Sequence, residues 1–355
     1  MGGTAATASA VIVLRAERAL RTARVSQDHT TAAHLLRVTA DDPEYVRQAA
    51  AEAAFWEQVH PLGLEAGEER YLEGAIEQYV NERFTGDRST DWVATISRWG
   101  TFRHGLFLGA SSPSRERRVL ETNPQVRMML VDISPGTVER RVGALAARFG
   151  DRIMGDAGDL NFLVLPSEHY DLVVSSSTIH HVTNLEHLAF QINRALTPDG
   201  VFFLEDYVGE PRFGFSPAKR RVFEMLYERE VSRQPRKKPG LAWIDGSDLS
   251  PFCGVRSDEI LSVFRDHLDQ VQLRTAGALT VPLTRARPLD FEHVLRHLPR
   301  WRILYAVLVK RLGIRERIPI DPRYLGELRL VGDVAADAGL LQPGTAFAVY
   351  RKRRA

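Results

Sequence analysis

The 355-residue sequence contains a single cysteine, Cys253. One cysteine excludes an intramolecular disulfide and any metal site built on several thiolates. No activating neighbour is evident beside it, so we interpret Cys253 as an inert thiol. No apolar run approaches the roughly 18–20 residues that a membrane helix needs. The apolar start, residues 1–14, lacks a basic leader region, which predicts a tail or a helix rather than a signal peptide, and hence a cytoplasmic enzyme.

The sequence also lacks a strong charge of either sign, with a formal net charge of +2 from 47 basic and 45 acidic residues. This balance gives no argument for a nucleic-acid partner, and we expect neither nucleic acid nor membrane as a partner. Only five of the basic residues are Lys, and this bias toward Arg together with abundant Ala is typical of a high-GC bacterial genome. The basic run 233–238 is interpreted as a solvated face.

Residues 1–98 predict a helical N-terminal extension. Apolar residues recur there at helical spacing from Glu44 to Trp99. Asp42 and Pro43 are suited to open one of these helices, as its cap and its first residue. No internal repeat and no low-complexity tract interrupts this pattern.

From residue 99 to 355 short apolar strands alternate with longer amphipathic segments, which predicts an α/β domain with helices on both faces of a mostly parallel sheet. Two stretches break the alternation, a proline-rich one over about 208–255 and an arginine-rich one over about 282–325, and we interpret them as lid insertions. We expect strands over 105–109, 126–132, 152–155, 170–175, 201–207, 270–275 and 345–350, and helices over 114–121, 135–149, 185–196, 257–268 and 327–338.

Several short motifs in this domain resemble the class I S-adenosylmethionine (SAM) dependent methyltransferases, specifically a bacterial small-molecule group. The resemblance covers residues 50 to 352 and implies a Rossmann-like fold with a seven-stranded sheet. It rests on Leu106–Gly109, Val131–Ser134, Gly158–Asn161, Tyr170–Val174, His180–Glu186, Leu196–Gly200, Glu205–Gly209 and Arg212–Phe213.

The resemblance implies a cofactor site if SAM is used. Gly109 would form the turn after the first strand, and Asp132 would hold the ribose hydroxyls, since a carboxylate suits a vicinal diol. Asp159 and Leu160 would flank the adenine. Each carboxylate also has a structural interpretation: Asp132 as the cap of the following helix, and Asp159 as a turn residue.

The loop after the first strand departs from the family, which has glycines where Ser111 and Pro113 stand and an acidic residue in place of Phe107. A Cβ and a missing N–H are unfavourable where backbone must approach a cofactor. We therefore predict that the protein uses no cofactor, with SAM as the alternative. The loop instead offers hydroxyls and an arginine at a helix start, which suits a phosphate or sulfate, or merely caps the helix. The residues of this predicted anion site are Ser111, Ser112, Ser114 and Arg115.

The candidate catalytic residues follow the fourth and fifth strands. His180 and His181 offer a neutral imidazole as a base, or else are structural. Glu205, Asp206 and Tyr207 end the fifth strand, and Arg212 beyond them is a candidate for binding an anionic group. No acidic residues stand near the histidines at metal-ligand spacing, so we expect no metal site.

Three functions follow. The preferred one is a methyltransferase-fold enzyme of specialised metabolism that works without SAM and cyclises a small amine-containing metabolite; some actinobacterial relatives form aziridine rings in this way, expelling sulfate. The second is a SAM-dependent methyltransferase acting on a small natural product or sugar. The third is a non-catalytic methyltransferase-like subunit. The partners are then a small-molecule substrate and either a second copy of the chain or a heteromeric partner protein.

Overall fold

In the computed structural model, residues 33–59, 75–232, 241–243, 245–288 and 322–354 are described. Seven strands form one sheet in the order β3-β2-β1-β4-β5-β9-β7. Strand β9 pairs antiparallel with β5 and β7, and the other pairs are parallel. The strands are β1 (His104–Leu108), β2 (Arg127–Asp132), β3 (Ile153–Ala157), β4 (Tyr170–Ser176), β5 (Leu196–Tyr207), β7 (Asp269–Ala276) and β9 (Thr345–Arg351). This topology confirms the expected class I methyltransferase fold.

The core lies on both faces of the sheet because alternate residues of each strand face opposite ways. On β1, Leu106 and Leu108 join the apolar cluster under one face, and Phe107 joins the cluster under the other. The first face is covered by α8 (Leu185–Ala195) and α10 (Ile260–His267). The second is covered by α5 (Ala75–Thr85), η3 (Trp92–Trp99), α6 (Pro113–Thr122) and α7 (Pro135–Phe149).

Local sequence sets the ends of these helices. Ser134 caps α7 by accepting a hydrogen bond from the Thr137 N–H, and Gly150 ends it with a positive φ of 60°. Asp42 caps α3 (Pro43–Val59) as predicted, since its Oδ1 accepts from the backbone N–H groups of Glu44 and Tyr45.

The segment from 208 to 255 contains η6 (Pro211–Phe213), α9 (Pro217–Ser232), β6 (Leu241–Trp243) and η7 (Gly246–Asp248). Strand β6 pairs antiparallel with β8 (Ala286–Pro288), which follows α11 (Val281–Arg285). The sequence pattern missed this small sheet because three-residue strands are too short to show alternation. The basic run 233–238 and most of the second predicted insertion lie outside the described residues.

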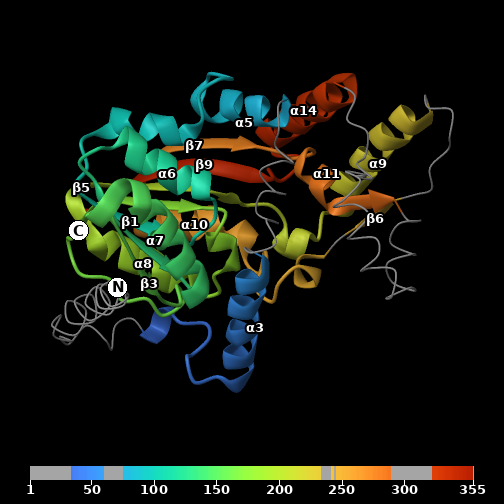
Figure 1. Ribbon diagram of the computed structural model, residues 1–355. Coiled ribbons are helices and arrows are strands. Elements are labelled where there is room, and N and C mark those ends of the chain that lie inside the picture. Colours follow the sequence, from blue (N-terminus) through green and yellow to red (C-terminus); the bar gives the residue numbers. More distant parts are fainter. Residues whose placement is uncertain (1–32, 60–74, 233–240, 244, 289–321, 355) are drawn as a thin grey trace, which may run out of the picture.

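Figure 1 shows α3 at the lower edge of the molecule, away from α5 and α14 (Pro322–Asp337), which lie together near β7. Ile76 of α5 and Leu328 of α14 share one apolar cluster with Phe223 of α9. Among the described residues, no helix combines the length and apolarity needed to cross a membrane.

Candidate functional site

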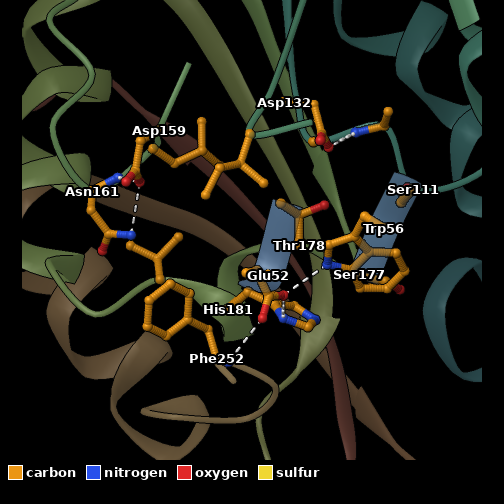
Figure 2. Close-up of a pocket in the computed structure, with 15 residues that line it drawn as sticks. Glu52, Trp56, Ser111, Asp132, Asp159, Asn161, Ser177, Thr178, His181 and Phe252 are labelled. Carbon is orange, nitrogen blue, oxygen red and sulfur yellow. Dashed lines mark hydrogen bonds and ion pairs between the residues drawn. The ribbon is translucent and has the colours of Figure 1, made fainter. Parts of the chain in front are cut away.

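A cavity lies at the carboxyl ends of the central strands, where the space between the lining side chains, together with the solvent that adjoins it, amounts to about 580 Å³. This is the edge at which parallel α/β sheets bind ligands. Figure 2 shows its walls, which we call the turn side (Gly109 to Ser111, Asp132 to Ile133, and Asp159 to Asn161) and the histidine side. The histidine side consists of Glu52, Trp56, Ser177, Thr178, His181, Val182 and Phe252.

The turn after β1 is held in a conformation that favours glycine. Gly109 has a φ of +83°, and a Cβ there would collide with the side chain of Thr178. The Gly109 N–H donates to Val131 O at 2.8 Å, so the turn is tied to β2. The missing side chain therefore makes room for Thr178, which packs directly against this turn.

Ser111 follows this turn and lies on the cavity wall (Figure 2). Its Oγ is buried and has no hydrogen-bond partner among the described residues. Buried polar atoms are nearly always paired, so an orphaned hydroxyl on a cavity wall indicates a missing ligand.

Asp132 ends β2, and the expectation that it caps the following helix is wrong, because Ser134 is the cap of α7. Asp132 Oδ1 accepts from Ser134 N at 2.9 Å and its Oδ2 accepts from Ala110 N at 2.8 Å, so it orders the two turns beside it. The same carboxylate lines the cavity. Burial raises its pKa, against the lowering effect of these backbone N–H donors. Each oxygen retains lone-pair capacity for a hydroxyl.

Asp159 is fixed by three donors. Its Oδ1 accepts from the backbone and side-chain nitrogens of Asn161, each at 2.9 Å, and its Oδ2 accepts from Tyr45 Oη at 2.6 Å. Burial and the charge of Asp159 raise the pKa of Tyr45, which keeps this phenol protonated. Leu160 is buried beside it on the wall. Tyr45 belongs to α3, so the N-terminal helix completes the turn side.

The two histidines of η5 (Ile179–His181) are each held at Nδ1 by a buried carboxylate. His180 Nδ1 lies 2.5 Å from Asp206 Oδ1, and His181 Nδ1 lies 2.8 Å from Glu52 Oε1. Of the two rings, His181 lines the cavity. The rings are adjacent, with centroids 4.2 Å apart. Two carboxylate–imidazole pairs therefore stand side by side.

Glu52 of α3 is 1% exposed and accepts from three further donors. These are Trp56 Nε1 at 2.7 Å, Ser250 Oγ at 3.0 Å and the Phe252 N–H at 3.0 Å. Burial acts to raise the pKa of Glu52, but hydrogen bonds and the charge of His181 outweigh it and lower that pKa to about 2. Burial and His180 act to lower the pKa of His181, yet Cys253 and Glu52 raise it overall.

Glu205 and Tyr207 flank Asp206 on β5, and the Tyr207 ring meets His180 edge-on, with centroids 6.3 Å apart. Glu205 Oε2 accepts from Ser176 Oγ at 2.8 Å and from Arg115 Nη1 at 2.6 Å. Tyr207 donates its hydroxyl to Glu210 O at 2.8 Å and stacks its ring on Phe213. Neither residue is among those that line the cavity.

The residues of the predicted anion site do not gather in one place. Arg115 is committed to Glu205 and Ser176, and Ser112 Oγ lies 2.9 Å from Ser114 Oγ. Arg212 donates to the carbonyls of Pro251 and Cys253. Ser111 lines the cavity, and Ser112, Ser114, Arg115 and Arg212 are not among its lining residues.

Among the residues that sequence reasoning missed are Glu52, Trp56 and Phe252, which line the cavity, and Tyr45, which holds Asp159. A weak signal existed for Glu52, a carboxylate among alanines and aromatics on a helix whose apolar face must be buried. Tyr45 and Phe252 also stack with centroids 5.4 Å apart, which joins α3 to the loop after β6.

Comparison with known proteins finds one matching family model, one curated relative and several solved structures of low sequence identity. Residues 108–202 match the family model described as methyltransferase domain. The chain is 28% identical over 211 residues to arginine-hydroxylase NDUFAF5, mitochondrial, of Danio rerio; the match covers 59% of this chain and only 60% of that relative.

Solved structures with low identity were also found. One is a Galdieria sulphuraria protein assigned as a sarcosine dimethylglycine methyltransferase, 15% identical, covering 75% of this chain and 85% of that one, with a TM-score of 0.44. Another is the [4+2]-cyclase SpnF, 16% identical, covering 76% and 81%, with a TM-score of 0.41. A third is phosphoethanolamine N-methyltransferase 2 of Haemonchus contortus with bound SAM, 14% identical, covering 74% and 52%, with a TM-score of 0.41. The strand order gives this chain the class I methyltransferase fold, and the family match over 108–202 lies within that fold.

Proposed function

We propose that this protein is a SAM-dependent methyltransferase acting on a small-molecule nucleophile. The observation that carries the proposal is the turn side of the cavity. There a glycine turn, the Asp132 carboxylate and the Asp159–Leu160 pair converge at the ends of β1, β2 and β3, within the segment that matches the methyltransferase domain. This proposal replaces the cofactor-free function that the sequence favoured.

The residues present fit such a cofactor. Gly109 is one of the residues that line the cavity, and the unpaired Ser111 Oγ supplies a hydroxyl for a polar tail. Asp132 offers oxygens suited to a ribose diol. Pro113 is the first residue of α6, where its missing N–H removes no helical hydrogen bond. Pro113 is therefore compatible with the helix that it begins, and it is not among the residues that line the cavity.

Bound SAM would supply an electrophilic methyl group. The chain's contribution is then mainly alignment, because a well-oriented pair of reactants gains most of its rate from geometry. The turn side would fix the donor. The histidine side, with His181 and Thr178 on its wall, would face the acceptor. Closure by Trp56 and Phe252 would keep water from competing as the acceptor.

The cofactor-free cyclisation and aziridine formation expected from the loop find no support. That function needs an open cationic cradle for a departing sulfate or phosphate. Arg115, the charge expected to provide it, forms an ion pair with Glu205 at 2.6 Å. Pairing of this kind leaves the arginine poorly placed to hold a second anion.

Calorimetric titration with SAM and S-adenosylhomocysteine tests the proposal. We expect micromolar binding, reduced roughly 10- to 100-fold in Asp132→Asn, because hydrogen bonds to a charged group contribute about 1.5–3 kcal/mol. Asp151→Asn, at an exposed carboxylate on the same domain, is the matched control and should bind like the wild type. Failure of the folded wild-type protein to bind either compound at millimolar concentration contradicts the proposal.

A further inference from the structure

The single cysteine of the chain lies against the histidine pair. One nitrogen of His180, one nitrogen of His181 and Cys253 Sγ all lie within 4.8 Å of one another. Cys253 is 4% exposed and directly follows Phe252, which lines the cavity. The sequence showed no activating neighbour for this thiol, and that expectation is wrong because two imidazoles lie beside Cys253.

A buried carboxylate fixes the orientation of each imidazole ring through its Nδ1 atom. Asp206 and Glu52 are fully buried and hold the two Nδ1 atoms, so the Nε2 atoms are left for another partner. Each carboxylate is itself immobilised by backbone donors: the N–H groups of Thr178, Ile179 and Tyr207 for Asp206, and that of Phe252 for Glu52. A carboxylate behind each histidine is the arrangement that fixes tautomer and ring direction in metal sites.

From this geometry we propose that His180, His181 and Cys253 form a binding site for a divalent cation of borderline softness, Zn²⁺. Thiolate and imidazole are the ligands that such an ion prefers, and three protein ligands leave a fourth position open. Bond lengths of about 2.0–2.3 Å place tetrahedral ligand atoms roughly 3.3–3.8 Å apart. Metal binding requires the present spread of up to 4.8 Å to close by about 1 Å.

The open position adjoins the cavity, because His181 and Phe252 both line it. A hydroxyl or thiol bound there would lose its proton more readily, since Zn²⁺ lowers the pKa of a bound protic group by several units. The site would then hold the acceptor of the proposed methyl transfer as an anion, and the released proton would pass to solvent. Metal binding itself does not depend on the methyl transfer.

Metal binding is tested on the full chain after chelation and buffer exchange. We expect one equivalent of Zn²⁺ by calorimetry and elemental analysis, and one equivalent of Co²⁺ with a thiolate-to-cobalt charge-transfer band in the near ultraviolet, displaced by Zn²⁺. Cys253→Ser should abolish the band, and Glu52→Gln should keep it while weakening affinity roughly 10- to 100-fold. His104→Gln, a change at an exposed histidine remote from the cluster, should bind like the wild type.

Two results overturn the metal site: no stoichiometric cobalt spectrum from the folded wild type, or an unchanged spectrum in Cys253→Ser. If Cys253→Ser does not fold, as judged by circular dichroism, His181→Gln is the second variant, and loss of one equivalent of metal is again required. Binding of S-adenosylhomocysteine is measured separately. A protein that binds this compound but no cobalt keeps the proposed function and loses the metal site.

Discussion

The two sides of the cavity are constructed differently. On the turn side, Asp132 bonds Ala110, 22 positions away, and Ser134, two positions away. On the histidine side, Glu52 bonds Phe252, 200 positions away, and Ser250, 198 positions away. The turn side is made mainly of turns that follow adjacent strands. The histidine side exists only where α3, η5 and the loop after β6 meet.

This difference predicts different consequences of substitution. On the turn side, a change should act mainly on the ligand, because neighbouring strands hold the backbone in place. On the histidine side, a change removes a shared anchor of three distant segments, so global stability should suffer as well.

The largest effect is expected from Glu52→Ala. This change leaves His181, Trp56 and the Phe252 N–H without their acceptor, and breaking a buried ion pair costs about 3–5 kcal/mol. Chemical denaturation measures the change in free energy of unfolding. Glu57→Ala on the same helix, at an exposed carboxylate, is the control and should cost under about 1 kcal/mol. Equal losses in the two variants would remove the distinction between the two sides.

Gly109→Ala should follow, with a loss of about 2–5 kcal/mol in stability or ligand affinity. Positive φ costs a side chain about 1–2 kcal/mol, and the collision with Thr178 adds about 1–3 kcal/mol. Gly86→Ala is a matched control, because Gly86 has a φ of +81° with nothing within 4 Å of an added Cβ. The difference between the two variants measures the collision alone, and a zero difference contradicts the packing described here.

Tyr45→Phe tests a hydrogen bond by which the N-terminal helix α3 reaches the turn side. Removal of the hydroxyl that donates to Asp159 should cost about 1.5–3 kcal/mol, because the acceptor is charged and partly buried. Thermal denaturation gives the stability change, and titration with S-adenosylhomocysteine shows whether the adenine end of the site also loosens. Unchanged stability would mean that the turn side does not depend on α3.

The most gradual effect is a pH dependence, with a slope of at most about 1.4 kcal/mol per pH unit for each titrating group in metal-free protein. Glu52 has a pKa lowered from 4.5 to about 2, so its contribution is full above pH 4.5 and is lost as the pH falls toward 2. His181 has a pKa raised from 6.5, so its contribution is full below pH 6.5 and is lost as the pH rises through the raised value. The stability difference between wild type and Glu52→Gln should therefore be greatest between pH 4.5 and 6.5. A difference that does not vary from pH 3 to 8 contradicts the ion pair.

The sequence predicted most of the fold because local patterns fix it. Alternation on β1 separates Leu106 and Leu108 from Phe107, and Ser134 and Gly150 bound α7 at the expected residues. Three-residue strands β6 and β8 carry too little pattern to be found in this way. For the site, motif positions placed Gly109, Asp132 and Asp159 at one edge of the sheet, and their roles toward a cofactor remain predictions.

Sequence alone thus determined the α/β alternation, the turn after β1 and the carboxylates that follow β2 and β3, since each depends on residues within a few positions of one another. Only the tertiary structure decided that Glu52 stands behind His181, that Tyr45 holds Asp159, and that the single cysteine faces two imidazoles. The physical reason is that the groups packed against a buried carboxylate, imidazole or thiol set its charge state and hydrogen bonding. Here those partners come from segments that lie far apart in the sequence.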